Sequence, residues 1–565
     1  MAILASAAVK LAGSLSSSRF EKATCNLREN QQALLQRILA DNQDTDYGKR
    51  HGFRDIKTLR DYAERVPIVD YEDLRSSIAR MAAGERAVLT REKPVLYAQT
   101  SGTTGDPKLI PVTPSCQSRS NSDQVRTWLY HAQRAHPTLF RGKVASLVSP
   151  AVEGHTEDGT PFGSTSGMMY RDLPWLMRRS YALPYELFEV DDYEARYYIA
   201  GRLSLRERIT FFCTANPSTV LKLAEAIDEH AEQLIRDIRD GTITPPNRFE
   251  HGLGRTVSVR PDPELARKLE RHRSQRGGRL LPRDYWPNLA LVGCWTGGTV
   301  GSYVDQLDAY FDPDGEGCLH LRDWGYLASE MRGSVPLEDG TSAGVLTANA
   351  NVFEFVPTEQ VADEPDDRSQ WQTLGAHEVE DGGEYHVIVT TTGGLYRYDI
   401  NDIVRVDGFH NDTPRISFIR KGKGMTNLTG EKVAADHVLQ AVAQAGSELG
   451  LEIRHSQAQA EIENSRYAFL VELHEEISDE RQHRLLEAIE KNLRGINLEY
   501  DGKRKSLRLE DPVLYVMASG WHDTAVEQAA NTNTRVFQTK VPPLKEADKE
   551  TLDETRAEAT AQVDL

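Results

Sequence analysis

Residues 99–108 form a loop rich in glycine and hydroxyl side chains, Gln99-Thr100-Ser101-Gly102-Thr103-Thr104-Gly105-Asp106-Pro107-Lys108. A short apolar run at 95–98 precedes the loop and predicts a strand. Small residues let backbone N–H groups approach phosphate oxygens, hydroxyls add donors, and the lysine adds positive charge. The spacing is not that of the GxxxxGK[ST] loop. The stretch therefore favours a phosphate-binding turn, with an ordinary Ser/Thr/Gly loop as the alternative.

The surrounding chain predicts an α/β fold. Between residues 140 and 310, apolar runs such as 143–148 and 209–212 alternate with helical stretches such as 218–236. This alternation is typical of buried strands layered against helices. Strands predominate from 343 to 420, which indicates a small β-barrel-like part beside the mixed sheets. We expect one large N-terminal domain over 1–419.

A second, smaller α/β domain is predicted after a hinge. Residues 420–425 are basic and punctuated by glycine, which suits a hinge. A helix at 435–449, strands at 453–462 and 467–473, and a helix at 480–494 follow. This order predicts a mobile C-terminal domain over 426–565.

Composition excludes several classes of protein. The net charge is −18, from 85 acidic and 67 basic residues, and no basic stripe marks a nucleic-acid surface. The five cysteines lie far apart without a CxxC pair, which favours reduced thiols over a disulfide scaffold. No segment reaches 18 uninterrupted apolar residues, so no membrane span is expected. We expect a cytoplasmic protein with neither nucleic acid nor membrane as partner.

Two further motifs carry polar chemistry. In 324–330, an aromatic side chain stands four residues before Glu330, so the aromatic is able to stack on a base while the carboxylate binds Mg²⁺ beside a polyphosphate. In 394–402, an aspartate is able to accept both hydroxyls of a ribose. Taken singly, a surface acid and a turn are the simpler interpretations of these two motifs.

The order of the motifs resembles the adenylate-forming superfamily and, within it, the Gretchen Hagen (auxin-responsive promoter) family of acyl-acid amido synthetases. The resemblance covers nearly the whole chain. It also rests on a helical lead-in around 42–71, a glycine turn at 296–298, a strand at 353–357 and a lysine motif at 537–542.

The resemblance implies roles for individual residues in an enzyme that uses ATP and Mg²⁺. It places Tyr326 on the adenine, Asp402 on the ribose and Glu330 on the metal. The other residues implied at the nucleotide are Ser101, Gly102, Thr103, Thr104, Lys108, Ser329 and Arg420. Lys108 also counts as catalytic, together with Lys540 and Lys432 of the small domain, which remain alternatives for the lysine that enters the site.

The acyl site is implied by the same resemblance. The glycine turn, Thr296, Gly297 and Gly298, is assigned to it, as is the helix after Pro111. An arginine of that helix commonly meets the acid in the family, whereas here Thr127 stands at the equivalent position and Arg126 one place before it. Asn401 replaces a glycine common in the family, so the backbone before Asp402 is expected to differ in shape.

The implied activity is that of an AMP-forming, ATP-dependent acid–amino acid ligase. A carboxylic acid is activated as an acyl-adenylate and passed to the amine of an amino acid, giving an N-acyl amide, AMP and pyrophosphate. One alternative is an acyl-CoA ligase, which shares the first step. The other alternative is a nucleotide-binding regulator without turnover.

Overall fold

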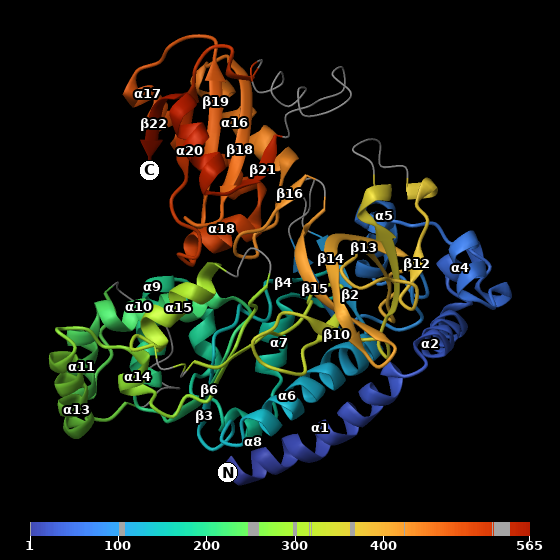
Figure 1. Ribbon diagram of the computed structural model, residues 1–565, viewed down its shortest axis with the longest axis horizontal. Helices are drawn as coiled ribbons and strands as arrows, with labels where there is room; N and C mark the ends of the chain where they lie inside the picture. Colours follow the sequence, from blue (N-terminus) through green and yellow to red (C-terminus); the bar gives the residue numbers. More distant parts are fainter. Residues whose placement is uncertain are drawn as a thin grey trace. The chain divides into compact units, whose positions relative to one another are not determined.

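The computed structural model describes residues 2–100, 108–246, 259–297, 302–315, 317, 319–361, 368–422, 424–522, 524 and 543–565. The chain folds into two compact units. The first unit comprises residues 1–99 and 109–419. The second unit comprises residues 420–565 and, from the earlier part of the chain, Thr100 and Lys108. Figure 1 follows the chain through both units, which are described separately below.

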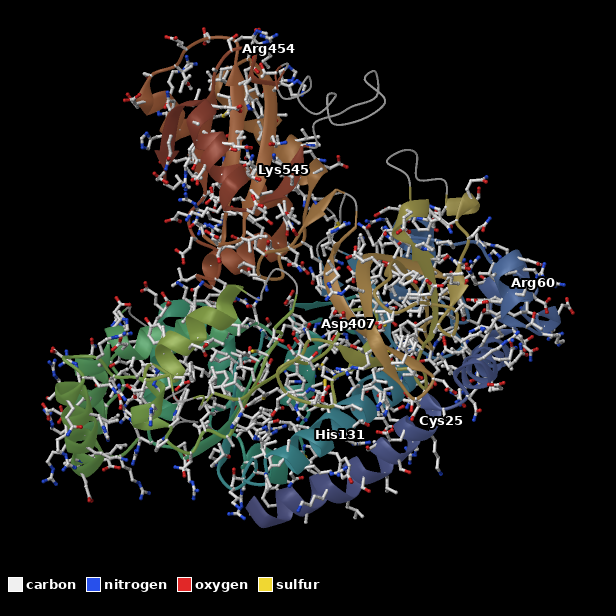
Figure 2. All side chains as sticks on the ribbon, viewed as in Figure 1. Cys25, Arg60, His131, Asp407, Arg454 and Lys545 are labelled. Carbon is white, nitrogen blue, oxygen red and sulfur yellow. The ribbon has the colours of Figure 1, made fainter. Side chains whose placement is uncertain are left out.

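Two long helices pack side by side at the start of unit 1, α1 (Ala2–Thr24) and α6 (Asp123–Ala135) (Figure 1). Gly13 makes the close approach possible, because a Cβ there would lie 2.7 Å from the Cβ of Tyr130. Phe20 of α1 is buried against Trp128 and its neighbours. His131 of α6 points toward α1, where its Nε2 lies 3.0 Å from the hydroxyl of Ser17 (Figure 2). This packing determines which face of α6 turns inward.

A four-stranded parallel sheet forms one core of unit 1. Its order is β3 (Lys143–Ser146), β6 (Ile209–Cys213), β7 (Leu291–Gly293) and β8 (Leu321–Arg322). The strands read as continuous apolar runs because helices cover a parallel sheet. The main surrounding helices are α9 (Tyr193–Ser204), α10 (Pro217–Glu229), α11 (Ala231–Asp240), α13 (Pro263–Gln275) and α15 (Ser302–Phe311). The carboxyl ends of β7 and β8 lead directly to Thr296 and Asp323.

A second small sheet carries the first motif. Its order is β2 (Lys108–Val112), β1 (Leu96–Thr100), β5 (Pro161–Gly163) and β4 (Gly154–His155). The strand expected before the glycine-rich loop is therefore present as β1. The loop itself, residues 101–107, lies outside the described residues.

A seven-stranded sheet corresponds to the β-rich part expected from the sequence. Its order is β12 (Leu374–Gly375), β11 (Val352–Pro357), β13 (Glu384–Thr390), β14 (Tyr398–His410), β15 (Thr413–Lys421), β10 (Gly344–Leu346) and β9 (Ser334–Val335). The helices α2 (Leu27–Asn42) and α5 (Tyr71–Ala82) pack with its core. Gln31 fastens α2 to the sheet, since its amide donates to the carbonyls of Ala348 and Asn351 and its oxygen accepts from Phe353 N–H.

Unit 2 is a five-stranded mixed sheet packed against helices. The order is β21 (Leu544–Ala547), β18 (Ile453–Glu461), β19 (Arg466–Leu473), β20 (Val513–Met517) and β22 (Ala559–Asp564). Its helices are α16 (Ala435–Leu449), α17 (Asp479–Ile496), α18 (Leu498–Lys505) and α20 (Lys549–Glu558). A short hairpin, β16 (Met425–Thr426) and β17 (Val433–Ala434), lies at the start of the unit. The helix–strand–strand–helix order expected from the sequence is present here.

The remaining helices of unit 1 are short: α3 (Asp46–Arg50), α4 (Leu59–Arg65), α7 (Thr165–Arg171), α8 (Trp175–Arg178) and α14 (Pro282–Tyr285).

Within the described part of the chain, no helix has both the length and the apolar character needed to cross a bilayer. The cysteines described there, Cys25, Cys116, Cys213 and Cys294, carry free thiols.

Candidate active site

The second motif folds as a tight hairpin over residues 326–333, which we call the Glu330 hairpin. Ala328 and Met331 exchange backbone hydrogen bonds of 2.9 and 3.3 Å, so Ser329 and Glu330 form its two-residue tip. Gly333 N–H donates to Tyr326 O at 2.7 Å. A Cβ at Gly333 would lie 2.5 Å from the ring of Tyr326, so only glycine fits beneath that ring. The turn thus presents a half-buried carboxylate at its tip.

The hairpin is joined to β14 through Tyr326 and Asp402. The Tyr326 hydroxyl donates to Asp402 Oδ2 at 2.7 Å, and both residues are buried, at 4% and 2% exposed. Burial raises the pKa of Tyr326 well above its ordinary value, and the Asp402 charge adds to the effect. The ring of Tyr326 lies parallel to Phe418 of β15, with centroids 6.2 Å apart. The residues expected at the adenine and the ribose are therefore direct neighbours.

Acidic side chains gather beside this contact. Burial raises the pKa of Tyr398 well above its usual range, and the charge of Glu330 adds to the effect. Burial raises the pKa of Asp399, which accepts from Asn401 N–H at 2.8 Å and Arg368 Nε at 3.1 Å. Across the described ranges, no three His, Cys, Asp or Glu side chains are arranged to hold a metal. Glu330 alone suits Mg²⁺ only if phosphate oxygens and water complete the shell, as Mg²⁺ commonly requires.

Asn401 has an unusual backbone conformation for a residue other than glycine. Its φ is +57°, in the left-handed region that glycine enters freely and that asparagine tolerates best among other residues. The expected difference in backbone shape before Asp402 stays a prediction. Residues 398–402 of the third motif lie within β14, so Asn401 and Asp402 belong to a strand and not to the tip of a turn.

Asp323 organises the glycine turn. Its carboxylate accepts from the backbone N–H and hydroxyl of Thr296 at 2.5 and 2.9 Å, and from Gly325 N–H at 2.5 Å. Burial raises the pKa of Asp323 to about 6, although these bonds favour its charged form. Sequence reasoning gave Asp323 no role, although the residue directly precedes the second motif and ends the β8 segment. It links that motif to Thr296.

The two predicted acyl-site residues of α6 are engaged elsewhere. Arg126 is exposed, and its Nη1 lies 3.2 Å from Asp123 Oδ1. The buried hydroxyl of Thr127 donates to the Asp123 carbonyl at 2.9 Å, within the helix. Gly297 stands in close contact with Ser342, whose Cβ would be 2.6 Å from an added Cβ. Of these residues, only the glycine turn adjoins the Glu330 hairpin, through Asp323.

Three further predicted residues, Lys108, Arg420 and Lys432, belong to unit 2 and are described by themselves. Lys108 begins β2 and is half-buried. In unit 2, Lys432 has a φ of +49° and its Nζ lies 3.7 Å from Glu499 Oε1, while Arg420 is exposed. Other predicted residues lie outside the described part of the chain, namely Ser101, Gly102, Thr103, Thr104, Gly298 and Lys540.

Comparison with solved structures shows that this fold resembles that of an acyl acid amido synthetase. The GH3.15 acyl acid amido synthetase superposes with a TM-score of 0.63 at 22% sequence identity, covering 97% of this chain and 96% of that one. The GH3 family N-terminal domain matches residues 16–315, its central domain 344–421 and its C-terminal domain 436–549. The chain belongs to the GH3 family, which confirms the resemblance seen in the sequence.

Curated relatives of the chain are ligases that form amides. The indole-3-acetic acid-amido synthetase GH3.4 of Arabidopsis thaliana is 27% identical over an alignment of 441 residues that covers 75% of this chain and 72% of the relative. The jasmonoyl–L-amino acid synthetase JAR4 of Nicotiana attenuata is 25% identical over an alignment of 552 residues that covers 93% of this chain and 92% of the relative.

Proposed function

We propose that this chain is an AMP-forming, ATP-dependent acid–amino acid ligase. The observation that carries the proposal is the joining of Tyr326, Asp402 and the Glu330 hairpin within a chain that matches all three domains of its family. In the first step the acid's carboxylate oxygen attacks the α-phosphorus of ATP. An O–P bond forms, the bond to the β-phosphate oxygen breaks, and pyrophosphate leaves.

The residues act mainly by positioning and by neutralising charge. The acid is already ionised at neutral pH, so no strong base is needed for the first step. Asp402, fixed by Tyr326, is assigned to the ribose, and Glu330 to Mg²⁺, which neutralises phosphate charge when bound. Residues 101–104 and Lys108 are assigned to the phosphates, with Ser329 and Arg420 also near the nucleotide. We assign the protein to the cytoplasm, because ATP is abundant in that compartment and the four cysteines described carry free thiols.

In the second step a neutral amine attacks the acyl carbon of the adenylate. A C–N bond forms, AMP leaves with the electrons of the C–O bond, and the amine nitrogen loses its extra proton to solvent. We propose that unit 2 turns about 420–425 between the steps and brings Lys432 or Lys540 to the site. Water must be excluded, since it competes with the amine for the adenylate.

Charge pairing in unit 2 favours an amine over coenzyme A as acceptor. The basic cluster at the end of α18, formed by Lys503, Arg504 and Lys505, is the feature we consider for holding the phosphates of coenzyme A. Two of its members are already neutralised: Arg504 pairs with Glu490 at 2.8 Å and with Asp511, and Lys505 pairs with Asp501 at 2.5 Å. A polyanionic acceptor would have to compete with these carboxylates.

The test is ATP–pyrophosphate exchange with a panel of carboxylic acids and no amine, followed by addition of amino acids or coenzyme A. We expect acid-dependent exchange, and then AMP and an N-acyl amino acid detected by mass spectrometry. Formation of a thioester without an amide would show the acyl-CoA ligase, and ATP binding without exchange for any acid would show the regulator.

A further inference from the structure

Arg332, on the Glu330 hairpin, is a buried cation with little to balance it. The residue is 9% exposed, and one nitrogen, Nη1, donates to the Trp324 carbonyl at 3.2 Å. Its Nε is enclosed without a hydrogen-bond acceptor among the described residues, and no carboxylate described there lies within ion-pair distance. Burial lowers the pKa of Arg332 to about 10, so the guanidinium is still charged at neutral pH.

Other buried arginines of unit 1 make more contacts through the guanidinium than Arg332 does, although Nη1 of Arg202 and of Arg322 is likewise enclosed without an acceptor among the described residues. Arg397 contacts Glu354 through Nε and Nη2 at 3.0 and 2.9 Å and donates through Nη1 to two backbone carbonyls. Arg202 donates to the carbonyls of Thr242 and Asp237, and the charge of Asp237 acts on it. Among the described residues, Arg332 donates a hydrogen bond to a single carbonyl, that of Trp324. Burying a charge without a counter-charge costs free energy. A cation that stays charged in such surroundings indicates that a bound ligand supplies the anion.

The side chain of Arg332 belongs to the face of the hairpin opposite Tyr326. Arg332 pairs with Leu327 across the hairpin, and directly opposed residues share a face, whereas Tyr326 and Met331 are buried in the core on the other face. The Arg332 guanidinium carbon lies 5.9 Å from the ring of Trp324. Gly325, the residue after Trp324, accepts a hydrogen bond through its carbonyl from Trp295 Nε1 at 3.2 Å. Thr296 of the glycine turn directly follows Trp295 in the chain.

We propose that Arg332 binds the carboxylate of the acid substrate and that the acid's apolar body lies against the indoles of Trp295 and Trp324. This inference rests on the proposed function and names the group that recognises the acid. A planar guanidinium matches a carboxylate in a two-point contact, and half-buried indoles suit a flat apolar acid. The α-phosphate of ATP, which the acid's carboxylate attacks, is the alternative anion at this position, and the KM values measured below separate the two. Arg332 therefore has the role at the acid that was expected of Arg126, which is exposed.

The test compares Arg332→Met and Arg332→Lys with the same change at an exposed arginine of α11, Arg239→Met. In the exchange assay, Arg332→Met should raise KM for the acid about 10- to 100-fold while KM for ATP stays within about twofold. Arg332→Lys keeps the positive charge but loses the planar, two-point guanidinium contact. Its KM for the acid should therefore lie between those of the parent and of Arg332→Met. Arg239→Met should match the parent.

A second readout does not require turnover. Benzoate, phenylacetate and indole-3-acetate, titrated without ATP, should raise the Tm of the parent and of Arg239→Met, with at least one acid effective. They should leave the Tm of Arg332→Met unmoved. Without ligand, Arg332→Met should be as stable as the parent or more so, because an uncompensated buried charge has been removed.

The outcomes separate this inference from the function on which it rests. A loss of Tm in ligand-free Arg332→Met with an unchanged KM for the acid would show a structural arginine and overturn the proposal. A raised KM for ATP alone would assign Arg332 to phosphate and overturn it too. Absence of exchange by the parent with every acid refutes the proposed function, while Arg332-dependent Tm shifts would still support carboxylate binding.

Discussion

The ionisation of a single carboxyl group couples the two halves of the candidate site. Asp323 holds Thr296 and Gly325 through three hydrogen bonds, and each bond uses a carboxylate oxygen as acceptor. Protonation places a hydrogen where an acceptor is needed, so it loosens the glycine turn from the Glu330 hairpin. With a pKa of about 6, Asp323 titrates inside the range in which enzymes are assayed.

We predict an acidic limb near pH 6 in the turnover rate of the exchange reaction, with activity lost below it. Asp323→Asn should be slow at every pH and lack that limb. The folded-state pKa is raised above the ordinary 3.8, so the contribution of Asp323 to stability is fully present below about pH 4. It is lost as pH rises through 6. Rates from pH 5 to 8 and urea titrations at the same pH values test both parts, and a limb that persists in Asp323→Asn would assign it to another group.

At the scale of elements, one buried ion pair ties the strands of the seven-stranded sheet together. Arg397 precedes β14 with a φ of +45° and contacts Glu354 of β11. It also donates to the carbonyls of Ala63 and Val66, at the end of α4. One side chain therefore joins two strands and a helix, and it supports the backbone that leads to Asp402.

We predict that Arg397→Met lowers the free energy of unfolding by about 3–5 kcal/mol, because it leaves the Glu354 carboxylate buried without its positive partner. The matched control is Arg405→Met, within β14. Arg405 is exposed and pairs with Asp407 at 2.7 Å, an acid labelled in Figure 2, and its loss should cost at most about 1 kcal/mol. Urea midpoints compare the two variants. Equal losses would mean that the buried pair contributes no more than a surface pair.

For the whole molecule, the lysines of unit 2 test the proposed movement about 420–425. We predict that Lys432→Ala or Lys540→Ala slows one half-reaction by about 100- to 1,000-fold and leaves the other nearly unchanged. Exchange measures adenylation, and single-turnover reaction of a preformed acyl-adenylate with an amino acid measures transfer. Lys491→Ala, an exposed lysine of α17 paired with Glu448, is the control. If both half-reactions survive both changes, these lysines are surface residues.

By itself the sequence determined the class of protein. The motifs that carry the resemblance are short and local, so residue type and order suffice to recognise them, and the family match agrees with them. The alternating strands and helices of unit 1 and the helix order of unit 2 were also readable, because periodic burial leaves its pattern in the sequence.

The tertiary structure alone decided which side chains meet. Tyr326 and Asp402 lie 76 positions apart and touch only because the hairpin packs against β14. The left-handed backbone of Asn401 is seen only in the φ value of the folded chain. Arg126 and Arg332 are chemically identical, but one is exposed beside Asp123 and the other is enclosed beside Trp324. Burial and charge pairing depend on distant segments packing together, and that information is not contained in any local motif.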